Sequence, residues 1–104
     1  MRVLSYLRME IDPDQMASYE RDLEEMLRLA RQMPGFLEAE VLQVRGEPNT
    51  YLVLSEWESH EAMRAFLMQK RHIEIIRGYK RGYGKGFERR RYARLHGVRK
   101  ELME

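Results

Sequence analysis

The chain has 104 residues, of which 43% are hydrophobic and 35% are charged, and it contains no cysteine. This length suits one domain, and the lack of cysteine excludes a disulfide framework and any thiolate site. No apolar run approaches the roughly 18 residues of a membrane-spanning helix, and residues 1–8 are too interrupted for a signal peptide. We therefore expect a cytoplasmic protein.

Charge is distributed unevenly along the chain. Residues 1–62 hold 13 acidic and 6 basic side chains, whereas residues 63–104 hold 4 acidic and 13 basic ones. This division favours either a basic functional face or the pairing of an acidic surface on one copy with a basic surface on another.

The chain begins with a predicted strand and a predicted helix. Residues 2–11 alternate apolar and polar side chains, which indicates a strand. Asp12 is suited to the N-cap of a helix and Pro13 to its first position. Apolar residues then recur at steps of three and four, at Met16, Tyr19, Leu23, Met26, Ala30 and Met33. Pro34 and Gly35 end this helix.

The middle of the chain predicts a hairpin and a second helix. Residues 36–44 and 51–57 have strand character, and residues 45–50 between them are rich in turn formers. Ser59 is suited to cap the next helix. We expect that helix to turn its inner stripe to the sheet through Ala62, Met63, Phe66, Leu67 and Lys70.

Residues 87–95 predict a last strand, so the order of elements is β-α-β-β-α-β. This order is typical of an α+β, ferredoxin-like fold, with an antiparallel sheet and two helices on one face. We predict one domain over residues 1–95 and a C-terminal tail over residues 96–104.

The predicted sheet is apolar on both faces. Two helices cover only one face, and on the other face Leu4, Tyr6, Leu52 and Leu54 remain. Exposing such a face is unfavourable by ~25 cal/mol per Å² of apolar surface. We therefore predict a homodimer in which two sheets pack face to face.

Two motifs resemble the antibiotic biosynthesis monooxygenase domain. They are Met33-Pro34-Gly35-Phe36 and Leu54-Ser55-Glu56-Trp57-Glu58-Ser59, the second followed by a helix that reaches Phe66. In that family a Pro-Gly-Phe element precedes the second strand, and a Trp lies at the end of the strand before the second helix. The resemblance covers about residues 2–76 and implies a dimeric α+β barrel. Family members include cofactor-free quinone-forming oxygenases, heme-degrading enzymes and isomerases.

The marks of two subclasses can be compared with this chain. Heme-degrading members carry an Asn on the first strand, a Trp in the second helix and a His about ten residues later; this chain has no such Asn and has Phe66 and Ile76 at the other positions. Cofactor-free oxygenases resemble it in Trp57 and in an Arg about twenty residues on, here Arg77. They carry an Asn where this chain has Val53. The chain thus shares more marks with the cofactor-free subclass than with the heme-degrading one, and this resemblance implies no bound cofactor.

Aromatic side chains are the candidate substrate-binding residues. We expect Trp57, Tyr51 and Phe66 to contact a small, flat, aromatic or quinonoid molecule, for which stacking area matters more than polarity. The alternative for Trp57 is a purely structural role as a core anchor at a strand end.

The candidate catalytic residues are Tyr6, Arg8 and Arg77. A buried phenol can donate a hydrogen bond to a substrate oxygen, and a guanidinium favours the ionised substrate that reacts with oxygen. The alternative is that Tyr6 lies at the dimer seam and that Arg8 pairs with an acid such as Glu56.

The histidines His60, His72 and His96 do not have the spacing of a metal site. We expect no metal, and we expect His72 on the surface or at a cap, with a general base or an axial heme ligand as the alternatives.

The segment 77–100 holds ten Lys or Arg residues and one acid, with aromatic residues between them. We expect Arg89, Arg90 and Arg91 to form a solvated face or to pair with acids of another subunit. The alternatives are that part of this set binds an anionic ligand, or that the segment binds single-stranded RNA. Alternation along a strand puts Arg90 on the opposite face from the other two, so the three cannot form one patch.

These observations predict a cofactor-independent, monooxygenase-like protein that acts on or binds a small aromatic molecule in a barrel cavity. A non-catalytic ligand-binding or regulatory dimer and an RNA-binding protein are the alternatives.

Overall fold

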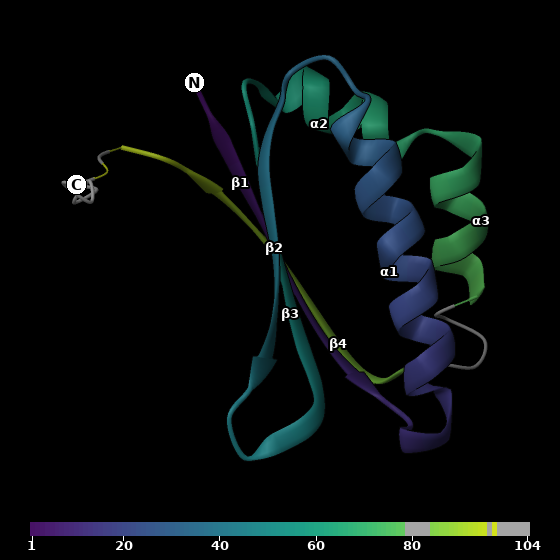
Figure 1. Cartoon of the computed structure of the whole chain (residues 1–104). Coiled ribbons are helices and arrows are strands. Elements are labelled where there is room, and N and C mark those ends of the chain that lie inside the picture. The colour runs from purple at the N-terminus through teal and green to yellow at the C-terminus, as the bar shows by residue number, and fades with distance from the viewer. Residues whose placement is uncertain (79–83, 96, 98–104) are drawn as a thin grey trace, which may run out of the picture.

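The protein folds into one antiparallel sheet with helices on one of its faces (Figure 1). The computed structural model describes residues 1–78, 84–95 and 97. The sheet order is β2-β3-β1-β4, from strands β1 (Val3–Ile11), β2 (Phe36–Val44), β3 (Glu47–Trp57) and β4 (Gly84–Ala93). The helices are η1 (Pro13–Gln15), α1 (Met16–Arg31), α2 (His60–Leu67) and α3 (Lys70–Gly78). The predicted ferredoxin-like α+β fold is confirmed.

The predicted second helix is two helices. The backbone N–H of Gln69 donates to the carbonyl of Phe66, three residues back, at 3.1 Å, which tightens the chain at the end of α2 before α3 begins at Lys70. This break resets the helical phase, so Lys70 is exposed and the expectation that it belongs to the inner stripe is wrong.

Of the two N-cap residues predicted from the sequence, Ser59 makes the expected capping hydrogen bond and Asp12 does not. The Ser59 hydroxyl accepts a hydrogen bond from the Ala62 N–H at 3.1 Å, as its N-cap position predicts. The Asp12 side chain makes no capping hydrogen bond; its backbone carbonyl accepts from the Gln15 N–H instead.

The hairpin turn is shorter than the turn formers of residues 45–50 predict. Val44 pairs with Glu47, so only Arg45 and Gly46 connect the strands, and Gly46 has a φ of +82°. Pro48 is accommodated because the pairing register shifts at this end of β2.

The register of the sheet separates its two faces. Ser5 and Leu7 of β1 pair with residues of β3 and β4 that line the helix side, whereas Leu4, Tyr6 and Arg8 alternate with them and point to the open face. The apolar residues of the sheet that the helices do not cover therefore lie on the open face, as the alternation predicts.

The core on the helix side is divided into two clusters. One contains Met9, Ile11, Tyr19, Leu23, Met26, Tyr51 and Ile75. The other lies nearer α2 and contains Ala30, Trp57, Met63 and Phe66. This division is what leaves room for the site described below.

In the described part of the chain, no helix is long and apolar enough to cross a membrane. The predicted tail 96–104 lies outside the described residues except for Gly97.

Candidate functional site

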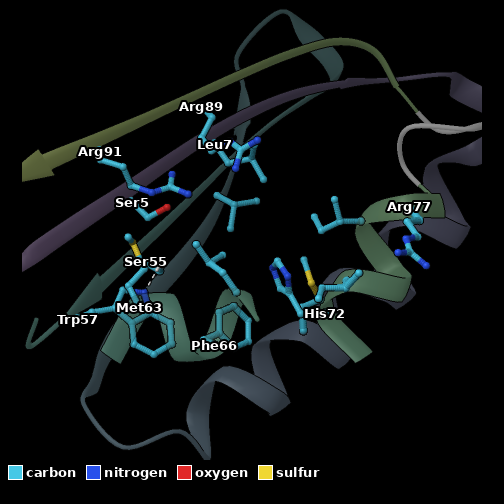
Figure 2. Close-up of a pocket in the computed structure, with 15 residues that line it drawn as sticks. Ser5, Leu7, Ser55, Trp57, Met63, Phe66, His72, Arg77, Arg89 and Arg91 are labelled. Atoms are coloured by element: carbon cyan, nitrogen blue, oxygen red, sulfur yellow. Dashed lines mark hydrogen bonds between the residues drawn. The ribbon is translucent and has the colours of Figure 1, made fainter. Parts of the chain in front are cut away.

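A pocket of about 330 Å³ lies between the sheet and the helices, at the border of the two core clusters (Figure 2). Its volume falls within the range of small-molecule sites. Six elements contribute lining residues: strands β1, β3 and β4 and helices α1, α2 and α3. The lining residues from the strands are Ser5, Leu7, Val53, Ser55, Trp57, Arg89 and Arg91.

One end of the pocket is a flat aromatic wall. The rings of Trp57 and Phe66 are stacked, with centroids 5.2 Å apart and planes at 27°. Phe36 packs edge-on against Trp57 at 5.3 Å. The indole N–H of Trp57 donates to the Ser55 hydroxyl at 3.1 Å, so the polar atom of this side chain is satisfied inside the protein. Trp57 is 1% exposed and thus serves the core and the pocket wall together.

Three arginines surround the pocket. Arg89 and Arg91 pair with Leu7 and Ser5 of β1, which places both on the helix side, and the exposed Arg77 lies on α3 at the end away from Trp57 (Figure 2). Burial lowers the pKa of the Arg91 guanidinium, and the nearby positive charge of Arg89 lowers it further. An anion placed beside the Arg91 guanidinium would stabilise its charged form.

Arg90 lies apart from this group. It pairs with Tyr6 on the open face, and its guanidinium forms an ion pair with Glu88 at 3.3 Å. The alternation predicted for this strand therefore holds, and the three consecutive arginines do not form one patch.

His72 contributes a buried imidazole to the pocket. The residue is 8% exposed, its ring packs edge-on against Phe66 at 4.7 Å, and its Nδ1 atom is buried without a hydrogen-bond partner among the described residues. Burial lowers the pKa of His72 to about 4; the carbonyl of Leu67 opposes this shift, and the charges of Arg89 and Arg91 add to it. The ring is therefore neutral at pH 7. The expectation that His72 is a surface or capping residue is wrong.

No aspartate or glutamate is among the described residues that line the pocket. The described residues also contain no cluster of His, Asp and Glu that could hold a metal ion. The chemistry available in the pocket is thus aromatic stacking, positive charge and hydrogen bonding by neutral groups.

The structure brings together half of the candidate site residues. Trp57, Phe66 and Arg77 line the pocket. Tyr51 belongs to the other core cluster, where its hydroxyl donates to the Glu20 carboxylate at 2.7 Å. Burial, reinforced by the hydrogen bond to Glu20, raises the pKa of Tyr51 to about 12.

Tyr6 and Arg8 lie on the open face of the sheet, away from the pocket. Tyr6 packs edge-on against Tyr92 at 6.4 Å. Arg8 pairs with an acid, as the alternative for this residue predicts, and that acid is Glu47, at 3.3 Å, and not Glu56. Glu56 instead pairs with Arg94 at 2.6 Å, because Arg94 at the end of β4 reaches the same end of the sheet.

Three polar residues of the pocket, Arg89, Arg91 and His72, were not among the preferred catalytic residues, although a general base was the alternative for His72. Arg89 and Arg91 share a strand face, a signal visible in the sequence once the inner face of β4 is known. His72 carries no comparable signal, because the break between α2 and α3 sets which side of α3 turns inward. Val53, at the position where the resemblance expects an Asn, lines the pocket with an apolar side chain.

Comparison with solved structures shows the same fold in several bacterial proteins. A proposed antibiotic biosynthesis monooxygenase of Deinococcus radiodurans aligns with a TM-score of 0.86 and 18% identity, over 96% of this chain and 99% of that one. Rv0793 of Mycobacterium tuberculosis gives 0.85 and 12%, over 95% and 100%. SnoaB, a cofactor-independent oxygenase from Streptomyces nogalater, gives 0.82 and 18%, over 95% and 98%. Identities this low establish the fold alone.

No curated protein sequence matches this chain. The family model for antibiotic biosynthesis monooxygenase matches residues 3–77, which hold β1 to β3 and the three helices that enclose the pocket. The chain therefore belongs to the antibiotic biosynthesis monooxygenase family.

Proposed function

We propose that this protein binds a small, flat phenol in its ionised form and promotes its oxidation by molecular oxygen without a bound cofactor. The observation that carries the proposal is the pocket itself, in which an aromatic wall faces a group of arginines with no acid in the lining. Stacking on Trp57 and Phe66 would hold the ring, and Arg91 would hold the phenolate oxygen.

The chemistry needs no external reductant. A phenolate is electron-rich and can transfer electrons to oxygen, whereas the neutral phenol does so poorly. In the overall reaction one oxygen atom enters the ring as a new carbonyl, the other leaves as water, and the phenol becomes a quinone. The substrate supplies all the electrons, so the task left to the protein is to bind the anion and hold it away from bulk water.

Binding of the anion can be tested with 4-nitrophenol, whose ionised form absorbs visible light. We expect the pKa of the probe to fall when it binds, and we expect it to quench the fluorescence of Trp57, the sole tryptophan. Arg91→Gln should weaken binding of the phenolate about tenfold, because one charge-assisted hydrogen bond is lost. Spectrophotometric titration gives both values.

Arg90→Gln is the matched control, because Arg90 is on the other face of the sheet and should leave the titration unchanged. Equal effects of the two substitutions, or a probe pKa that rises on binding, would contradict the proposal. Oxygen uptake with a panel of polycyclic phenols, in the presence of a chelator, then separates an oxygenase from a protein that only binds the phenolate.

We also propose that the protein is a homodimer that buries the open face of the sheet. The face carries the half-buried residues Leu4, Tyr6, Leu52 and Leu54, and it continues to Leu42 and Tyr92, which are 40% and 45% exposed. A second copy supplies a matching apolar sheet, which is the isologous contact expected of a two-fold dimer.

Leu54→Glu should convert the dimer to a monomer, because two carboxylates would be buried near the centre of the interface. Light scattering after gel filtration measures the mass. Met68→Glu, a change of the same chemistry at a residue that is 62% exposed on the helix side, is the control and should leave a dimer. A monomeric wild-type protein at micromolar concentration would overturn this proposal.

A further inference from the structure

We propose that His72 accepts a hydrogen bond from a second hydroxyl group of the ligand, so that the pocket takes aromatic molecules that carry one anionic oxygen and one un-ionised hydroxyl. This inference rests on the proposed function and names its substrate class more closely. It assigns to His72 a binding role that the arginines cannot fill, since a guanidinium can only donate hydrogen bonds.

The first support is the state of the imidazole. Its Nδ1 atom is buried and unpartnered, although buried polar atoms in folded proteins almost always have a hydrogen-bond partner. Figure 2 shows the ring of His72 projecting from α3 toward the sheet, on the side of Leu7 and Arg89. Because His72 lines the pocket, a hydroxyl group of a bound ligand would supply the imidazole with a hydrogen-bond partner.

The second support is the charge around the ring. The groups that face His72 are Arg89 and Arg91 from β4, Phe66 from α2 and the carbonyl of Leu67 at the end of that helix. Burial lowers the pKa of His72 to about 4, and the two nearby cations act in the same direction, so the ring stays unprotonated at pH 7. A neutral imidazole keeps one nitrogen lone pair that can accept a hydrogen bond.

The third support is the small number of other acceptors. Besides His72, the uncharged polar side chains of the lining are Ser5 and Ser55, and the Ser55 hydroxyl already accepts the Trp57 N–H. The arginines select the anion, and His72 or Ser5 is left to select a hydroxyl. His72 is the better placed of the two, because it packs directly against the aromatic wall through Phe66.

The test compares probes that differ by one hydroxyl group. These are 4-nitrophenol and three dihydroxynitrobenzenes, 4-nitrocatechol among them, which carry the second hydroxyl at different ring positions. We expect at least one dihydroxy probe to bind about tenfold more tightly than 4-nitrophenol. His72→Phe should remove this advantage, so that the ratio of the dihydroxy probe's affinity to that of 4-nitrophenol falls to about one. His72→Gln retains an acceptor and should recover part of the advantage.

Ser5→Ala is the matched variant for the other hydroxyl partner, and it should leave the advantage intact. A measurement on the unmodified protein does not depend on any variant folding: the ¹⁵N resonance of His72 Nδ1 should shift with the preferred dihydroxy probe and not with 4-nitrophenol.

The outcomes separate the two proposals. If 4-nitrophenol binds but no dihydroxy probe binds more tightly, or if His72→Phe weakens all probes alike, the role of His72 is overturned and the phenolate site stands. If Ser5→Ala removes the advantage, the acceptor is Ser5 and the assignment to His72 is wrong. If no probe binds the unmodified protein, the phenolate site and this inference fail together.

Discussion

Gly35→Ala is expected to destabilise the protein by about 3 kcal/mol or more, as measured by urea unfolding. Gly35 ends the turn after α1 with a φ of +84°, a conformation that L side chains rarely adopt. A Cβ atom at this position would also lie 2.5 Å from the Cβ of Ala62 in α2. Ala62 is short and held by its helix, so the clash can be relieved only by moving the backbone.

Two variants separate these causes. Gly46→Ala introduces the same change at a φ of +82° with no atom within 4 Å, so it should cost only about 1 kcal/mol. Adding Ala62→Gly to Gly35→Ala removes the clash and should restore about 1 kcal/mol or more, even though a helical glycine itself costs up to about 1 kcal/mol. A double variant no more stable than Gly35→Ala would show that the close approach to Ala62 has no role.

This contact explains why the two motifs of the family resemblance occur together. The Glu58 N–H donates to the Gly35 carbonyl at 2.8 Å, and Phe36 packs against Trp57. The motif after the first helix and the motif before the second are thus two sides of one junction. Because α2 also carries Phe66, this junction sets the position of the pocket wall.

Stability is expected to fall as the pH is lowered from about 6.5 to about 4, by up to about 3 kcal/mol, through His72 alone. Burial is the main cause of the lowered pKa of His72, so the folded protein resists protonation in this window while the unfolded chain takes up a proton. The unfolded state therefore binds more protons between these pH values, and the free energy of unfolding rises with pH. Above about 6.5 both states are neutral and the effect ends.

His72→Phe removes the titrating group, so its unfolding free energy should lose this part of the pH dependence. The difference between the wild type and the variant, measured by urea unfolding at a series of pH values, isolates His72 from the carboxylates. His60→Gln, at an exposed position, is the control and should keep the wild-type slope. Parallel pH profiles for the wild type and His72→Phe would mean that His72 is solvated in solution.

Local patterns were sufficient for most of the fold. Alternation along β1 separated Leu4 and Tyr6 from Val3 and Leu7, and the strand period placed Arg89 and Arg91 on one face with Arg90 on the other. The Ser59 cap was likewise readable, because a cap depends on a side chain and a backbone N–H only three residues away. Such features involve neighbours in the chain, so they leave a periodic signal.

The pocket was not readable in the same way, because it depends on contacts between distant segments. The sequence indicated that Tyr6 and Tyr51 were suited to bind a phenol, but each lies outside the pocket, one on the open face and one in the other core cluster. The short break after Leu67 turns α3 so that His72 is buried beside β4. Residue types and periods established the sheet, its two faces and the aromatic wall residue Trp57. Only the packing of the helices on the sheet creates the space between the two clusters. The same packing brings the neutral histidine and the arginines together there, since burial and electrostatic fields are properties of the folded chain.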